Sequence, residues 1–256
     1  MINLPQSVPD WCFYKEGMDA SSYYARLSSL GYAGVEIVDP KRWAAARAAG
    51  LAIVNLAAPG MQDGVNKERN RISVSAQIRE CLATANANGI PTVIVFSGSR
   101  QGQDDDEGLR QCITVFKELA RDAERLGVTL AFEMLNSFEH TDYMADHSRF
   151  GFALAEAVGS PRFKILYDIY HMFRMGEDVL ADLLGHRESI AHIHVAGSPR
   201  RDFPGTRQEI HYADIVKKVT AAGYTGFWGQ EFLPSTDDPF TDLEAASMLF
   251  TRYAKG

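Results

Sequence analysis

The sequence lacks the features that mark several large classes of protein. Its three cysteines, Cys12, Cys81 and Cys112, are odd in number and show no CxxC or Cys/His spacing, which argues against a disulfide framework and a structural zinc site. No apolar run approaches the roughly 20 residues that span a bilayer. The N-terminal stretch MINLPQSVPDW has no basic segment followed by an apolar one. We therefore expect a cytoplasmic protein that does not associate with membranes.

Basic runs and glycine-rich phosphate loops are also absent. The 33 acidic residues outnumber the 26 basic ones, for a net charge of −7, and no stripe of Lys and Arg could follow a nucleic-acid backbone. Nucleic acid is therefore not an expected partner, and a small-molecule substrate is. Since no loop reads as a phosphate cradle, we expect that substrate to be unphosphorylated.

What the chain does have is an alternation of short apolar runs and amphipathic segments that end in glycine, such as those at 19–31, 106–127 and 211–223. Eight runs read as strands: 9–14, 34–39, 51–57, 92–98, 129–136, 163–169, 190–197 and 227–233. Eight βα units in 256 residues, with no linker-like segment, predict an α/β fold, a (β/α)8 TIM barrel forming a single domain over residues 1–256. A doubly wound open sheet is the alternative, but no GxGxxG follows the first strand.

Polar residues of metal-binding types end four consecutive predicted strands: Glu133, Asp168, His194 and Glu231. In a barrel, the carboxyl ends of the strands carry the chemistry, so these side chains can converge on one point. Three carboxylates and one imidazole suit a divalent ion, Mg²⁺ or Mn²⁺ first, with Co²⁺ or Zn²⁺ as alternatives. The competing interpretation is that each is an ordinary buried polar group whose hydrogen bonds are satisfied by its neighbours. The occurrence of four such residues on successive strands argues against that interpretation.

Further polar residues lie near the same ends. Arg200, in the loop GSPRRD, is positioned to bind a substrate oxygen or carboxylate, although the adjacent Arg201 leaves the choice between them open. Glu36 ends the second predicted strand, as either a substrate contact or the partner of a basic residue. His192 reads as a core histidine with a hydrogen-bonded ring. Trp11 and its neighbours read as an apolar wall.

These residues lie in motifs that resemble those of the sugar isomerase/epimerase superfamily of TIM barrels related to xylose isomerase, and more closely its hydroxypyruvate isomerase branch. The motifs are PDWCF, VFSGSRQG, FEMLNS, VGSPRFK, LYDIYHM, HIHVAGSPR and GQEF, which span nearly the whole chain in the expected order. Several relatives carry a histidine where this third strand ends in NLAAPG, so the finer assignment differs there.

The resemblance implies that Glu133, Asp168, His194 and Glu231 bind one divalent metal. It also implies that Glu133 and Glu231 exchange the substrate proton, while His171 and Arg200 bind substrate oxygens. For hydroxypyruvate, proton transfer through a cis-enediolate would give tartronate semialdehyde. A homo-oligomer is expected as well.

The sequence leaves four alternatives open and argues against a fifth. A ketose 3-epimerase, a 2-oxotetronate isomerase or an inosose dehydratase would use nearly the same residues. A non-catalytic sugar or carboxylate binding protein is an alternative of a different class, although binding alone does not require a paired acid and base. A metal-dependent abasic-site endonuclease on this fold would need many more histidines at strand ends and a basic groove, which this acidic chain with seven histidines does not supply.

Overall fold

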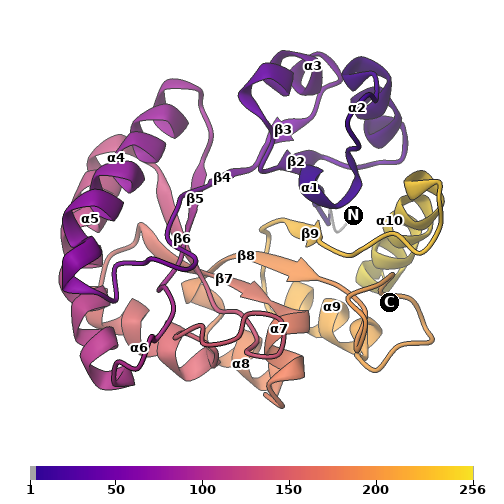
Figure 1. Cartoon of the computed structure of the whole chain (residues 1–256). Coiled ribbons are helices and arrows are strands. Elements are labelled where there is room, and N and C mark those ends of the chain that lie inside the picture. Colours follow the sequence, from indigo (N-terminus) through magenta and orange to yellow (C-terminus); the bar gives the residue numbers. More distant parts are fainter. Residues whose placement is uncertain (1–3, 256) are drawn as a thin grey trace. The chain divides into compact units, whose positions relative to one another are not determined.

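The computed structural model describes residues 4–255, which divide into two compact units that are described here separately. The first unit comprises the described residues up to Val54 together with those from His192 onward, and the second unit is Asn55–Ala191. The colours of Figure 1 follow the chain through both units. The expectation of a single domain stays a prediction.

The first unit contains five strands whose order is β3-β2-β1-β9-β8, and the neighbours pair in parallel. Its elements are β1 (Gln6–Pro9), α1 (Asp10–Phe13), α2 (Ala20–Ser29), β2 (Gly34–Glu36), the 3-10 helix η1 (Pro40–Arg42), α3 (Trp43–Ala48), β3 (Ala52–Ile53), β8 (Ile190–Val195, which begins in the second unit), α9 (Tyr212–Ala221), β9 (Trp228–Gln230) and α10 (Pro239–Lys255).

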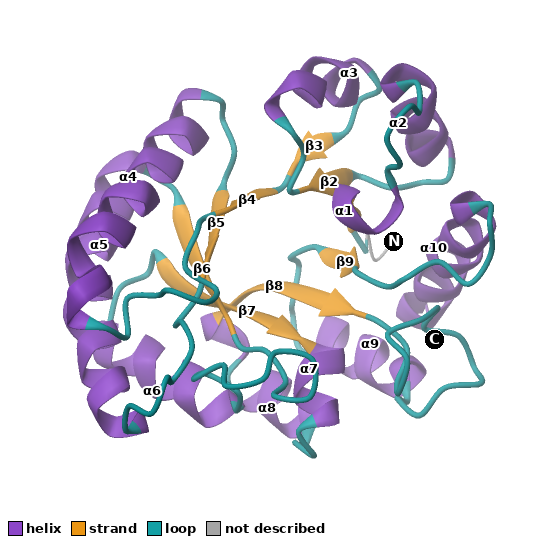
Figure 2. Cartoon of the chain, viewed as in Figure 1, coloured by secondary structure: helices purple, strands orange, loops and turns teal. Residues whose placement is uncertain are grey.

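The second unit contains four parallel strands in the order β7-β6-β5-β4. Its elements are β4 (Asn55–Ala57), the 3-10 helix η2 (Glu68–Asn70), α4 (Arg71–Ala87), β5 (Thr92–Val95), α5 (Asp105–Leu126), β6 (Thr129–Glu133), α6 (Ser148–Val158), β7 (Phe163–Asp168), α7 (Ile169–Arg174), α8 (Val179–Gly185) and the 3-10 helix η3 (Arg187–Ser189). Figure 2 shows β5 and β6 each leading through a loop into a helix, and α7 follows β7 directly, which is the predicted βα alternation.

The sequence pattern of α5 explains how one such helix forms and where it packs. Asp104 caps its start by accepting hydrogen bonds from the N–H groups of Asp106 and Glu107, and Gly127 ends it in a left-handed conformation with φ of 70°. Such an N-cap typically contributes about 1 kcal/mol. The buried face of α5 places Phe116 against the ring of Phe163, with centroids 4.9 Å apart. The three helices predicted at 19–31, 106–127 and 211–223 are confirmed as α2, α5 and α9.

The first predicted strand, at 9–14, was wrong. Strand β1 ends at Pro9, and Asp10–Phe13 forms a single helical turn, α1. The buried Asp10 accepts a hydrogen bond from the hydroxyl of Tyr24 at 2.6 Å and pairs with Arg42 at 3.1 Å, which anchors the turn. An apolar triplet in one helical turn has the same composition as a strand, so periodicity could not separate the two.

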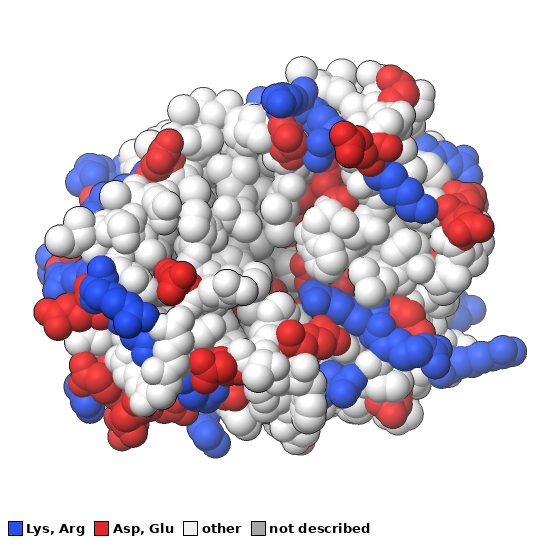
Figure 3. All heavy atoms as spheres, in the orientation of Figure 1, with Lys and Arg blue, Asp and Glu red and all other residues white. Residues whose placement is uncertain are grey.

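The third predicted strand, at 51–57, consists of two short strands, β3 and β4. The remaining six predicted runs each contain one strand that is shorter than predicted. On the face shown in Figure 3, Asp and Glu are interspersed with Lys and Arg. None of the helices within residues 4–255 is long and apolar enough to cross a membrane.

Candidate active site

The first unit brings three buried polar side chains together at its strand ends. Glu36 is the last residue of β2, and His192 and His194 lie on β8. Oε2 of Glu36 lies 2.9 Å from Nε2 of His194 and 3.0 Å from Nε2 of His192, and Oε1 accepts a hydrogen bond from the hydroxyl of Ser7 at 2.6 Å. The predicted hydrogen-bonded core histidine at position 192 is confirmed in its burial and in its carboxylate neighbour.

The charge of Glu36 determines how His194 is oriented. Burial raises the pKa of the Glu36 carboxyl, but the two histidine rings outweigh burial and hold that pKa well below its usual range. Glu36 is therefore an ionised acceptor to which the Nε2–H of His194 donates. When His194 is neutral, the imidazole carries only the N–H on Nε2, so Nδ1 then presents a lone pair. A carboxylate that orients the far nitrogen in this way is the usual support of a metal-binding histidine.

The lone pair of His194 points toward a second carboxylate. Nδ1 of His194 lies 3.2 Å from Oε2 of Glu231, the residue directly after β9, and both side chains are buried. Two acceptor atoms so close repel each other unless a cation or a proton lies between or beside them. The guanidinium of Arg201 is one such cation beside Oε2 of Glu231. An imidazole nitrogen and a carboxylate oxygen are also donor types that a divalent ion binds, so the pair is compatible with a bound ion.

The carboxylate of Glu231 is held on both of its oxygens. The indole N–H of Trp11 donates to Oε1 at 3.0 Å, and the guanidinium of Arg201 donates to Oε2 at 2.7 Å. Arg201 also lies over the Trp11 ring, 5.2 Å from its centroid. Arg200 instead pairs with Asp202 at 2.7 Å, with 79% of its side chain exposed. In this unit the structure thus places Arg201, rather than Arg200, against a predicted site residue.

Trp11 was expected to form an apolar wall, and its hydrogen bond to Glu231 was missed. The Arg200–Arg201 pair signalled that one arginine belongs to the site, but adjacent residues in a loop give no indication of which one turns inward.

Glycine at position 229 allows this cluster to form. A Cβ atom at Gly229 would lie 2.4 Å from Oε1 of Glu36, 2.6 Å from Cδ2 of His194 and 2.9 Å from Nε2 of His192. Contacts below 3.0 Å are essentially never seen for a real Cβ atom. The strand β9 can therefore pass beside the three side chains only without a side chain of its own.

The second unit positions two predicted ligands on neighbouring strands. Glu133 ends β6 and Asp168 ends β7, and the parallel register pairs Glu133 with Leu166, two residues before Asp168. Both carboxylates are buried, and an oxygen of each lies within 4.8 Å of the other. Two buried carboxylates at this separation repel each other, which again favours a cation or a proton beside them.

The conformation around His171 fixes which of its nitrogens carries the proton. Asp168 caps α7, because its Oδ1 accepts the backbone N–H of His171 at 2.9 Å. Nδ1 of the ring accepts the backbone N–H of Asn136 at 3.2 Å and lies 2.6 Å from the Asn136 side-chain amide. The Nδ1 atom is thus an acceptor, so His171 is neutral with its proton on Nε2, which lies 3.7 Å from Oδ2 of Asp168. His171 therefore presents a hydrogen-bond donor beside the Asp168 carboxylate.

A further group of metal-binding residue types, Glu139, His140 and His171, lies in the second unit. The fixed tautomer places a proton on Nε2 of His171, so this nitrogen has no lone pair to offer a metal ion. This group therefore fits a metal less well than the strand-end residues do.

Comparison with known proteins places the chain in a family. The family model described as xylose isomerase-like TIM barrel matches residues 24–248. A hydroxypyruvate isomerase of Escherichia coli is 33% identical over 43% of this chain, a match that spans only 42% of the E. coli protein. A 2-oxo-tetronate isomerase of Cupriavidus necator is 28% identical over 82% of this chain and 86% of its own length.

The fold is matched by solved structures over nearly the full length. A crystal structure titled AP endonuclease, family 2, from Brucella melitensis superposes with a TM-score of 0.84 and 20% identity, covering 98% of this chain and 99% of that one. At this identity the likeness shows the fold alone. The predicted TIM-barrel fold is thereby confirmed, and the chain belongs to the xylose isomerase-like TIM barrel family.

Proposed function

We propose that this protein is a metal-dependent isomerase of small hydroxy-oxo acids that converts hydroxypyruvate to tartronate semialdehyde (2-hydroxy-3-oxopropanoate). The observation that carries the proposal is the oriented pair in the first unit, where His194, fixed by the ionised Glu36, presents Nδ1 at 3.2 Å from Glu231. The relatives named hydroxypyruvate isomerase and 2-oxo-tetronate isomerase support the substrate class.

We infer that Glu133 and Asp168 of the second unit and His194 and Glu231 of the first hold one divalent ion, Mg²⁺ or Mn²⁺ in preference to Co²⁺ or Zn²⁺. The chemistry supplied by a bound divalent ion is polarisation of the substrate's carbonyl and hydroxyl oxygens, which acidifies the adjacent C–H.

The two glutamates carry the proton in this mechanism. One of Glu133 and Glu231 removes a proton from C3 of hydroxypyruvate, and the electron pair of that C–H bond forms the C2–C3 double bond of a cis-enediolate. The other glutamate delivers a proton to C2, while the hydroxyl proton passes from the oxygen on C3 to the oxygen on C2. The product contains the same atoms as the substrate, so no oxidant or reductant is needed.

His171 would orient the substrate, and Arg201 would modulate the charge of the catalytic Glu231. The Nε2–H of His171 is a fixed donor suited to the oxygen that changes from hydroxyl to carbonyl. Arg201 neutralises part of the charge of Glu231. The substrate-binding role assigned to Arg200 by resemblance stays a prediction, and the contact geometry favours Arg201 for it.

The substrate-binding role expected of Glu36 also stays a prediction. Its carboxylate is completely buried and accepts hydrogen bonds from Ser7 and from histidine, which supports a role in orienting His194 instead.

A direct test is a substrate panel assayed in ²H₂O with Mg²⁺ or Mn²⁺, before and after exhaustive chelation. The panel contains hydroxypyruvate, 2-oxotetronate, fructose and tagatose, and exchange of solvent deuterium into each substrate is measured by NMR. We expect metal-dependent exchange into hydroxypyruvate, and loss of that exchange in Glu133→Gln and Glu231→Gln with unchanged far-UV circular dichroism. Turnover of ketohexoses alone, or full activity after chelation, would contradict the proposal.

A second candidate within the same chemistry is 2-oxotetronate isomerisation. The C. necator relative with that name aligns over 86% of its own length, which supports this candidate. The additional carbon of 2-oxotetronate would need room beyond C3, so the ratio of kcat/KM for the two acids separates the candidates.

A further inference from the structure

Two loops of the second unit are joined to each other beside the end of β6. They are the β5–α5 loop (residues 96–104) and the β6–α6 loop (residues 134–147). Ser99 and Tyr143 form an antiparallel bridge between them, and the backbone N–H of Arg100 donates to the carbonyl of Asp142 at 2.7 Å. The β6–α6 loop directly follows Glu133, so its position bears on that residue.

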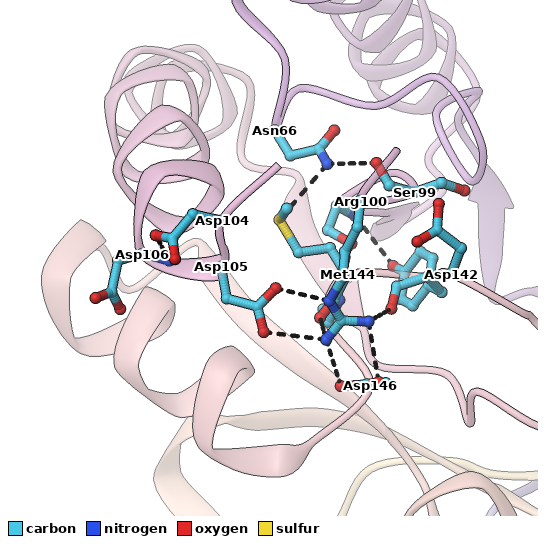
Figure 4. A network of polar contacts seen from close by, with 12 residues as sticks. Asn66, Ser99, Arg100, Asp104, Asp105, Asp106, Asp142, Met144 and Asp146 are labelled. Carbon is cyan, nitrogen blue, oxygen red and sulfur yellow. Dashed lines mark hydrogen bonds and ion pairs between the residues drawn. The ribbon is translucent and has the colours of Figure 1, made fainter. Parts of the chain in front are cut away.

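The side chain of Arg100 closes this junction, as Figure 4 shows. Its guanidinium binds both carboxylate oxygens of Asp105, at 2.6 and 3.1 Å, and both of Asp146, at 2.9 and 3.1 Å. It also donates to the backbone carbonyls of Tyr143 at 2.5 Å and Met144 at 3.0 Å. The fork of Arg100 thus ties the start of α5 to the β6–α6 loop through six hydrogen bonds. We call this set of contacts the Arg100 latch.

Tyr143 connects the Arg100 latch to the strand that bears Glu133. The Tyr143 hydroxyl donates to the backbone carbonyl of Glu133 at 2.9 Å and accepts the backbone N–H of Ser97 at 3.0 Å. The ring is buried, with 1% of its surface exposed. Arg100 binds the carbonyl of Tyr143, and the hydroxyl of Tyr143 binds the carbonyl of Glu133. This one residue therefore connects the Arg100 guanidinium to the backbone of Glu133.

The backbone at the junction adopts conformations that require such support. Gln101 and Asp142, which face each other across the two loops, both have positive φ, 48° and 70°. A non-glycine residue in this region costs on the order of 1 kcal/mol or more. The side chain of Asp142 accepts the backbone N–H of Gln101 at 2.8 Å, and its carbonyl accepts the backbone N–H of Arg100 at 2.7 Å.

We propose that Arg100 is a positioning residue for proton transfer, which acts through Tyr143 to fix the backbone of Glu133 and therefore the direction of its carboxylate. This inference rests on the proposed function, in which Glu133 exchanges the substrate proton. Lysine cannot replace arginine here, because a single ammonium group cannot bind two carboxylates bidentately.

The test uses Arg100→Lys, Arg100→Ala and Tyr143→Phe in the full-length, metal-loaded protein. Because misplacement of a reacting group by about 1 Å can cost about 100-fold in rate, we expect kcat for hydroxypyruvate to fall roughly 10- to 100-fold in Arg100→Lys and Tyr143→Phe, with little change in KM. Added ethylguanidinium is expected to restore part of kcat in Arg100→Ala only. The double variant Arg100→Lys/Tyr143→Phe is expected to lose no more than the worse single variant, because both changes break the same connection.

A readout that does not depend on activity is amide hydrogen exchange, measured by mass spectrometry. Exchange in the β6–α6 loop is expected to accelerate in Arg100→Lys. The matched control is Arg79→Lys, because Arg79 also pairs with a carboxylate, Asp122 at 2.8 Å, but lies on α4 away from this loop. The control is expected to keep wild-type kcat and exchange.

Two outcomes distinguish the inference from the proposed function. Inactive Glu133→Gln together with wild-type kcat in Arg100→Lys would overturn the role of Arg100 alone. Unchanged activity in Glu133→Gln would overturn the proposed function, and the role of Arg100 in it as well.

Discussion

Replacing Gly229 by alanine is a sharp perturbation of the buried cluster in the first unit. The new Cβ atom would lie 2.4 Å from Oε1 of Glu36, which must move by about 1.0 Å to reach the 3.4 Å at which ordinary contact begins. Glu36 cannot move freely, because Ser7 holds the same oxygen at 2.6 Å and His194 lies 2.9 Å from the other oxygen. A shift of this size lengthens the bond to His194 beyond hydrogen-bonding distance.

Two effects of Gly229→Ala follow from this geometry. Overpacking of a tight core typically costs about 1–3 kcal/mol, so we expect the free energy of unfolding to fall by that amount. Loss of the carboxylate that orients a metal-binding histidine typically weakens metal affinity by about 10- to 100-fold, and we expect the Kd for Mn²⁺ to rise accordingly.

The assays are urea unfolding followed by circular dichroism, and calorimetric titration of Mn²⁺ into the folded protein. Gly185→Ala is the matched control, because a Cβ atom at Gly185, the last residue of α8, meets nothing within 4 Å. The control is expected to unfold at the same or a slightly higher urea concentration and to keep its Mn²⁺ affinity. Unchanged stability and unchanged Kd in Gly229→Ala would refute the assignment of this cluster as the support of His194.

Three further predictions concern other contacts. Arg201→Ala is expected to lower kcat/KM at least 10-fold, whereas Arg200→Ala, at a side chain that is 79% exposed, is expected to change it less than 2-fold. The reverse order in steady-state kinetics would support Arg200 as the substrate-binding residue. Burial raises the pKa of Asp146, but its arginine and histidine partners outweigh burial and lower that pKa. The stabilisation from Asp146 is therefore present above the pKa of the unfolded state, near 4, and is lost as the pH falls through the lower pKa of the folded state. In Asp146→Asn, the free energy of unfolding, measured with urea, should therefore decrease less steeply as the pH is lowered. Arg42→Ala leaves Asp10, which is 2% exposed, without its cationic partner and should cost about 3 kcal/mol in the same measurement, and a loss below 1 kcal/mol would contradict that role for the pair.

Much of the arrangement could be predicted from the sequence because it depends on local patterns. Alternation of apolar runs with glycine-terminated helices is set by backbone geometry, so α2, α5 and α9 and the strands that carry Glu133 and Asp168 were predicted within a few residues. The turn after Pro9 was not predicted, because the tertiary partners of Asp10 determine it.

The residues around Glu231 illustrate what only the tertiary structure decided. The sequence determined that polar residues end successive strands and that an arginine follows β8. It could not determine that Arg201 turns toward Glu231 while Arg200 pairs with Asp202, that Trp11 donates a hydrogen bond, or that Glu36 accepts one from His194. The spacing of residues along the chain fixes which side of a strand each one occupies, whereas hydrogen-bond partners depend on distances between segments far apart in sequence. Those distances are set only when the packed strands bring such segments together.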